Sequence, residues 1–167
     1  VYDPAVDIAP ADTPPGPEFP MKQTALCATS GRLEGSQFDS VPLNTVWGVK
    51  KLHGFATGKG QTVAVIDSGV NRNDRLPQLL GGGDYIEGRD GLFDCDHHGT
   101  LIAGLIAARP SPDDGFVGLA PDATIVSIRQ TSAAYQVDAG RTGNAREAQA
   151  ASNLTTLARS IVHAANL

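Results

Sequence analysis

Two polar residues in this 167-residue sequence have the types and settings needed for proton transfer. Asp67 ends the apolar run Val63-Ala64-Val65-Ile66, and His98 stands at the start of a second apolar segment. Taken singly, the aspartate is typical of a turn and the histidine of a helix cap. When the two side chains lie together, the carboxylate can hold one nitrogen of the imidazole, and the second nitrogen can take a proton from a nucleophile. We therefore expect Asp67 and His98 to act as orienter and general base.

The elements around these residues predict an α/β fold with a parallel sheet. Continuous apolar runs at 62–66 and 124–129 are typical of strands buried on both faces. Helical spacing predicts one helix over about 99–109, and Ser152 or Asn153 is expected to cap another. Alternation of strands and helices favours parallel crossovers, and functional groups gather at the carboxyl ends of such strands.

Several stretches carry more specific expectations. The run Gly81-Gly82-Gly83 predicts a turn before a short strand at 84–86. Residues 132–152 are rich in Ala, Gln, Asn, Gly and Ser without periodicity, which predicts an exposed loop. Gly104, inside the first helix, indicates tight packing against a neighbour. The expected apolar stripes are Ile102, Leu105 and Ile106 in the first helix and Leu154, Leu157, Ala158, Ile161, Val162 and Ala165 in the second.

Charge and hydropathy exclude some partners. Thirteen Lys and Arg against eighteen Asp and Glu give a formal charge of −5. This balance argues against nucleic acid or an anionic membrane surface as the main partner. With 41% apolar and 19% charged residues, the composition is that of an ordinary globular chain. No apolar run reaches the roughly 18 residues of a membrane span.

The first 45 residues differ from the rest. Six prolines in the first twenty positions exclude helix and favour extended backbone. A disordered tail and an arm lying across a folded body both fit this composition; Cys27 favours the arm. Cys27 and Cys95 are the two cysteines, either separate thiols in a reducing compartment or a pair in an oxidising one.

Metal sites are the weaker alternatives. The run Asp94-Cys95-Asp96-His97-His98 offers five potential ligands, but sequence neighbours rarely converge on one ion. Asp113 and Asp114 fall in a turn, where two carboxylates are usually only solvated. The sequence therefore predicts no metal and no cofactor.

Three ordered motifs resemble those of the subtilisin-like serine proteases. Residues 63–69, ending Asp67-Ser68-Gly69, resemble the aspartate motif of that family. The segment His98-Gly99-Thr100-Leu101-Ile102-Ala103-Gly104 resembles its histidine motif, with Leu101 and Ile102 as departures that keep the histidine. Val117-Gly118-Leu119-Ala120-Pro121 resembles the segment that follows.

This resemblance implies a three-layer αβα subtilisin-like fold, of which this chain is the N-terminal part. It implies peptide-bond hydrolysis by a Ser-His-Asp triad to which the chain gives Asp67 and His98. The family's Gly-Thr-Ser motif is not in the sequence, and Ser68, Ser127 and Ser132 stand in other contexts. The nucleophile is therefore expected from a C-terminal remainder of the catalytic domain, and this chain alone is expected to be inactive.

Further details resemble the mycosin branch, the subtilases of mycobacterial type VII secretion: the proline-rich arm, the two cysteines and the segment 94–98. That resemblance implies an N-terminal extension, 1–45, wrapping the catalytic domain portion, 46–167, and a Cys27–Cys95 disulfide. It also implies an extracytoplasmic location, an anchor in the membrane through a segment outside this chain, a protein or peptide substrate and contact with a secretion complex. A non-catalytic assembly role in that complex is the alternative.

Overall fold

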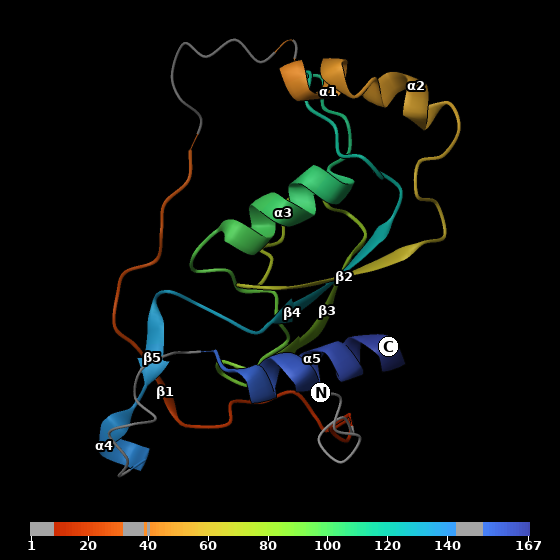
Figure 1. Ribbon diagram of the computed structural model, residues 1–167. Helices are drawn as coiled ribbons and strands as arrows, with labels where there is room; N and C mark the ends of the chain where they lie inside the picture. The colour runs from red at the N-terminus through yellow and green to blue at the C-terminus, as the bar shows by residue number, and fades with distance from the viewer. Residues whose placement is uncertain (1–8, 32–38, 40, 143–151) are drawn as a thin grey trace, which may run out of the picture.

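The computed structural model describes residues 9–31, 39, 41–142 and 152–167. Its centre is a parallel sheet with strand order β2-β4-β3, formed by β2 (Thr62–Asp67), β4 (Thr124–Arg129) and β3 (Leu79–Asp84). Helix α3 (His98–Ala107) covers one face of the sheet and α5 (Leu154–Asn166) the other (Figure 1). These three layers agree with the predicted subtilisin-like αβα architecture.

Shorter elements surround this centre. The described part of the N-terminal arm forms β1 (Met21–Gln23), which pairs antiparallel with β5 (Tyr135–Val137). Helices α1 (Pro42–Val46) and α2 (Val49–His53) precede the first strand of the central sheet, and α4 (Ala139–Thr142) follows β5. The arm passes below α5 and up beside the sheet (Figure 1). Among the described residues, no helix has both the length and the apolar character needed to cross a bilayer.

Small residues let α3 approach the sheet. Ala103 and Ala107 are buried against Val65 and Ile125 of the strands. The predicted stripe is only partly correct, because Ile102 and Ile106 pack against this core whereas Leu105 is 44% exposed. The expectation for Gly104 was wrong as well: a Cβ there would meet nothing within 4 Å. The small residues thus allow the closest approach of α3 to the sheet, with the two isoleucines beside them.

Helix α5 begins where the sequence predicted. Asn153 is its N-cap: the side chain accepts from the Thr156 backbone N–H at 2.8 Å, within a capping box. The predicted apolar stripe, however, is not the buried side, because Thr156 and Ser160 are fully buried while Leu154 and Ile161 are exposed. The Thr156 hydroxyl accepts from Gln130 Nε2 at 3.1 Å, which ties this side of the helix to the residue after β4.

The glycine run was wrongly predicted as a turn. Residues 81–83 lie inside β3, and their lack of side chains allows close packing. A Cβ on Gly82 would lie 2.5 Å from Val126 Cγ1, and one on Gly81 2.6 Å from the Asp90 carbonyl oxygen. Gly83 has a φ of +116° and packs against Pro15 of the arm. These glycines therefore serve the contacts of a strand.

The exposed loop predicted for 132–152 is also wrong in its described part. Residues 135–137 form β5, and Ala134, Tyr135 and Val137 are buried. Their strand partner is more than 110 positions away in the arm, so no local pattern signals it. Residues 143–151 of the predicted loop lie outside the described residues, as do 1–8, 32–38 and 40 of the predicted extension.

Candidate active site

Asp67 and His98 meet at the carboxyl end of the central sheet. Asp67 is the last residue of β2, and His98 is the first residue of α3. The imidazole Nδ1 lies 2.8 Å from Asp67 Oδ1 and 2.9 Å from Oδ2. The carboxylate therefore accepts a hydrogen bond from Nδ1–H, which fixes the tautomer that leaves Nε2 as an acceptor.

Neighbouring backbone groups hold the aspartate in place. Its Oδ1 accepts from the Ser68 N–H at 2.6 Å, and its carbonyl oxygen accepts from Gln130 N at 2.8 Å. Gly69, with a φ of +99°, lets the chain turn directly after the strand. A Cβ on Gly99 would lie 3.2 Å from Asp67 Oδ1 and would collide with the Gly69 carbonyl. The glycine after the histidine thus allows the helix start to approach the strand end.

The histidine is exposed on its outer side. Its side chain is 68% exposed and that of Asp67 18%. No hydrogen bond from the described residues reaches His98 Nε2, so this nitrogen is open to a group arriving from solvent. The hydrogen bond to Asp67, followed by the charge of Asp67, raises the pKa of His98 above its ordinary value of 6.5. The charges of Asp94 and Asp96 act in the same direction.

The three serines considered from the sequence are already engaged elsewhere. Ser68 Oγ donates to Asp94 Oδ1 at 2.8 Å, and Ser127 Oγ donates to the Gly91 carbonyl at 2.8 Å. Ser132 Oγ lies 3.3 Å from Asp96 Oδ1. All three side chains are buried. None of them is placed to give its proton to His98 Nε2.

A disulfide joins the arm to the segment before the histidine. Cys27 and Cys95 are bonded, with 4.5 Å between their Cα atoms. The Ala28 N–H donates to the Cys95 carbonyl at 2.8 Å, and Ser30 Oγ lies 2.7 Å from His97 Nδ1. The arm therefore contacts the turn that leads into α3 while the described part of it leaves His98 exposed.

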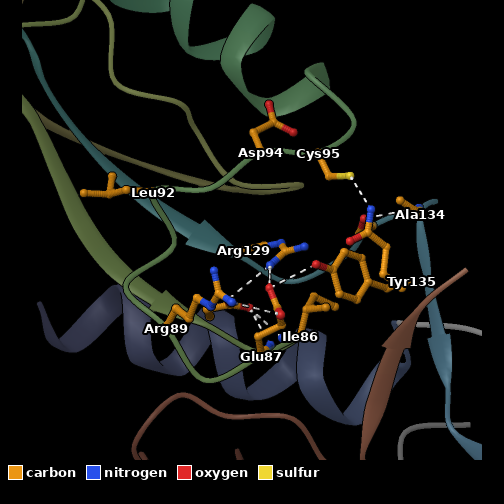
Figure 2. A network of polar contacts seen from close by, with 12 residues as sticks. Ile86, Glu87, Arg89, Leu92, Asp94, Cys95, Arg129, Ala134 and Tyr135 are labelled. Carbon is orange, nitrogen blue, oxygen red and sulfur yellow. Dashed lines mark hydrogen bonds and ion pairs between the residues drawn. The ribbon is translucent and has the colours of Figure 1, made fainter. Parts of the chain in front are cut away.

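A second cluster of charges lies beneath the disulfide. The side chain of Arg129 has no exposed surface, and its Nη1 lies 2.9 Å from Glu87 Oε2 and 3.3 Å from Asp84 Oδ2. The ring of Tyr135 lies 4.6 Å from the guanidinium (Figure 2), and the ring of Phe93 lies 5.1 Å from it. Burial alone would lower the pKa of Arg129, but the charge of Asp84 and the hydrogen bond to Glu87 raise it overall.

The metal alternatives gain no support from the geometry. In the part of the chain that the structure describes, no three His, Cys, Asp or Glu side chains are grouped to hold an ion. The carboxylate of Asp114 pairs with Arg75 at 2.9 Å. Cys95 is in the disulfide, and Asp94 is buried in contacts with helix α3.

Sequence reasoning considered Asp94 only as a metal ligand and Ser68 only as a nucleophile, and it missed the contacts that both make at this site. Both are buried, and a hydrogen bond links their side chains between the strand end and the helix start. The available signal was an aspartate placed just before a helix, where free backbone N–H groups need acceptors. The serine gave no such signal, because its role depends on a partner 26 positions later.

Comparison with known proteins adds a family match. Residues 58–165 match the family Peptidase S8, described as the subtilase family. Mycosin-1 of Mycobacterium tuberculosis is 48% identical over 167 residues, covering 96% of this chain and 37% of its own length. This chain therefore spans little more than a third of that curated relative.

Solved structures are also similar to this chain. The serine protease MycP1, described as an essential component of the type VII (ESX-1) secretion system, superposes with a TM-score of 0.86 at 47% identity. That match covers 99% of this chain and 45% of the other. A chain of the periplasmic assembly from the ESX-5 inner membrane complex gives a TM-score of 0.84 at 40% identity, covering 99% of this chain and 44% of the other.

Proposed function

The chain belongs to the subtilase family, and we propose that it supplies the general base and the orienting carboxylate of a serine endopeptidase linked to type VII protein secretion. The observation that supports this most is the arrangement at His98: Asp67 holds Nδ1 through both carboxylate oxygens, and Nε2 faces solvent. The family match and the mycosin relatives agree with this reading.

In the proposed mechanism, His98 Nε2 takes the proton of a serine hydroxyl as that oxygen attacks a peptide carbonyl. The imidazolium then gives the proton to the leaving amine, and an acyl-enzyme remains. Water repeats the two steps and releases the acid. Asp67 keeps the productive tautomer and stabilises the positive imidazolium, in keeping with the direction in which it moves the pKa of His98.

The nucleophile of this proposal lies outside the chain, in a Gly-Thr-Ser motif of the C-terminal remainder of the catalytic domain. The relatives are more than twice as long as this chain, which leaves room for such a segment. The same remainder would hold the oxyanion donors and the walls of the pocket for a peptide substrate. A fluorophosphonate probe tests this on the complete protein, because such probes react with activated serines.

We expect the folded, complete protein to be labelled at the serine of its Gly-Thr-Ser motif, located by mass spectrometry of the digest. Heat-unfolded protein serves as the control, since it keeps the serine but loses the Asp67–His98 pair. Absence of labelling in protein with a cooperative unfolding transition would contradict the protease proposal.

For location, we propose an extracytoplasmic domain anchored to the membrane through a segment outside this chain. The likeness to a chain of a periplasmic ESX-5 assembly supports this, and the Cys27–Cys95 disulfide suits an oxidising compartment. Residues 1–45 act in this proposal as an extension tied to the domain portion 46–167. The strand pair β1–β5 and the disulfide support a lasting attachment, because they fix the arm at two places.

The likeness to chains of ESX-5 inner membrane complexes favours a second candidate, an assembly role in which proteolysis is secondary. Replacing the chromosomal gene for this protein by an Asp67→Asn version distinguishes the protease role from the assembly role. Secretion that continues at the wild-type level would favour the assembly role; loss of secretion with the protein still present in its complex would favour the protease.

A further inference from the structure

One buried carboxylate joins the two halves of the candidate site. Asp94 is 1% exposed and lies directly before Cys95 in the segment that leads into α3 (Figure 2). Its two oxygens accept five hydrogen bonds, three on Oδ1 and two on Oδ2. A buried charge with so many donors is well compensated and is fixed in one orientation.

Four of these donors lie in the turn that precedes α3 and in the first turn of the helix itself. The backbone N–H groups of Asp96 and His97 donate to Oδ1 at 3.1 and 2.8 Å. The N–H and hydroxyl of Thr100 donate to Oδ2 at 2.8 and 2.6 Å. Because a helix leaves its first N–H groups unpaired, this carboxylate supplies acceptors that they need at the start of α3, and its charge also suits the positive end of the helix.

The fifth donor lies on the aspartate side of the site. Ser68 Oγ is 2.8 Å from Asp94 Oδ1 and 3.1 Å from Asp67 Oδ1, and it accepts from the Gly99 N–H at 2.9 Å. A hydroxyl has one proton to give. The shorter contact, to Asp94, takes that proton, and Asp67 Oδ1 stays available to the imidazole.

We propose that Asp94 is a positioning residue of the proposed triad: it ties the helix start carrying His98 to Ser68, the residue next to Asp67, and holds the Ser68 hydroxyl proton away from Asp67 Oδ1, which then accepts from the imidazole. This inference rests on the proposed function for its effect on turnover. Its effect on the imidazole itself does not need an active protease.

The test replaces Asp94 by Asn in the complete protein. Asparagine keeps the shape of the side chain but places an NH₂ group where only hydrogen-bond donors face it. Asp96→Asn is the matched control, because it removes the same charge two residues away and Asp96 also raises the pKa of His98. We expect Asp94→Asn to slow fluorophosphonate labelling about 10- to 100-fold, as for a catalytic group held slightly out of place. Asp96→Asn should stay within about threefold of the wild type.

Two-dimensional NMR of ¹⁵N-histidine-labelled protein provides the readout that a merely structural role would not move. Neutral His98 should be the Nδ1–H tautomer in the wild type and in Asp96→Asn, and a mixture of both tautomers in Asp94→Asn. The His98 signals are assigned by their loss in His98→Asn. If Asp94→Asn keeps the wild-type tautomer, or labels as fast as Asp96→Asn, the inference is wrong.

Ser68→Ala keeps the inference testable should Asp94→Asn fail to fold, since it removes only the linking hydroxyl. It should also mix the tautomers, and unchanged His98 signals in that variant would overturn the inference. Where both variants fold, their effects should not multiply, because they break one chain of contacts. A wild-type protein that resists labelling contradicts the protease proposal alone, and the tautomer measurement still decides the role of Asp94.

Discussion

Two ion pairs lie at the same edge of the central sheet and differ in almost every physical respect. Asp67 and Asp84 end the outer strands β2 and β3, and each is in register with Arg129 at the end of β4. The pair Asp67–His98 has side chains 18% and 68% exposed, whereas both side chains of Asp84–Arg129 are completely buried. The strand end alone does not make a reactive site; access to solvent decides which pair can do chemistry.

The buried pair is closed off from solvent and has a structural role. Arg129 contacts two carboxylates, and two aromatic rings lie 4.6 and 5.1 Å from its guanidinium. Tyr135 OH also donates to Glu87 at 3.1 Å (Figure 2). Its Nε and Nη2 atoms have no hydrogen-bond acceptor among the described residues, so the rings rather than oxygens face much of the guanidinium. A group enclosed in this way cannot exchange protons with a substrate.

The exposed pair contributes little to stability but much to reactivity. Ion pairs open to water are screened and contribute at most about 1 kcal/mol. Exposure also keeps His98 Nε2 within reach of a partner, and Asp67 keeps it unprotonated in the neutral imidazole. Each pair can therefore be broken with a distinct outcome.

The largest expected effect is on turnover. Asp67→Asn should lower labelling of the complete protein by about 10⁴-fold, because an amide can hold the imidazole in the wrong tautomer. The midpoint of thermal unfolding should change little, since the His98 side of this pair is open to solvent and the ion pair is screened. Labelling at the wild-type rate would remove Asp67 from the proposed mechanism.

Breaking the buried pair should act on stability instead. Arg129→Met is expected to lower the free energy of unfolding by about 3–5 kcal/mol, because Asp84 is left buried without its partner. Arg89→Met is the matched control: Arg89 also pairs with Glu87, at 3.4 Å, but its side chain is 60% exposed. Denaturant titration of both variants should show a loss below about 1 kcal/mol for the control. Equal losses would mean that burial does not separate the two kinds of pair.

Removing the disulfide tests how far the two regions depend on each other. Cys95 packs with Tyr135 and Ile86 in the cluster beside Arg129, and it stands three residues before His98. The variant Cys27→Ser with Cys95→Ser should lose about 2–4 kcal/mol of unfolding free energy, since the bond closes a long loop. Labelling of the folded fraction should stay within a few fold. A loss of labelling as large as that of Asp67→Asn would show that the arm positions the site.

The smallest expected effect is a pH dependence of the exposed pair. Asp67 raises the pKa of His98 above 6.5, so the pair stabilises the folded state fully below pH 6.5 and loses this contribution as the pH rises through the raised value. The difference in unfolding free energy between wild type and Asp67→Asn should therefore shrink with rising pH. A difference that grows over the same range would contradict the direction of the pKa shift.

The sequence predicted the elements whose signals are local. Apolar runs identified β2 and β4, and the capping side chain of Asn153 identified the start of α5. The proposed pair could be found because strand ends and helix starts place polar residues together at one edge of a parallel sheet.

What the sequence could not reveal depends on distant partners. The glycines of β3 predict a turn when only their local sequence is considered, because their contacts with Val126 and Pro15 come from distant segments. Strand β5 likewise depends on pairing with the arm strand β1. Arg129 ends an apolar run, yet its complete burial follows from carboxylates 42 and 45 positions earlier. Hydropathy also misled on α5, where Thr156 is buried and Leu154 is exposed.

The two adjacent histidines provide the most direct test of the central claim, that His98 is the general base. His97→Asn and His98→Asn are compared by fluorophosphonate labelling of the complete protein; asparagine also suits the left-handed backbone of His97, where φ is 63°. We predict that His98→Asn loses labelling by at least about 10³-fold while His97→Asn stays within a few fold. Labelling of folded His98→Asn at the wild-type rate would contradict the account.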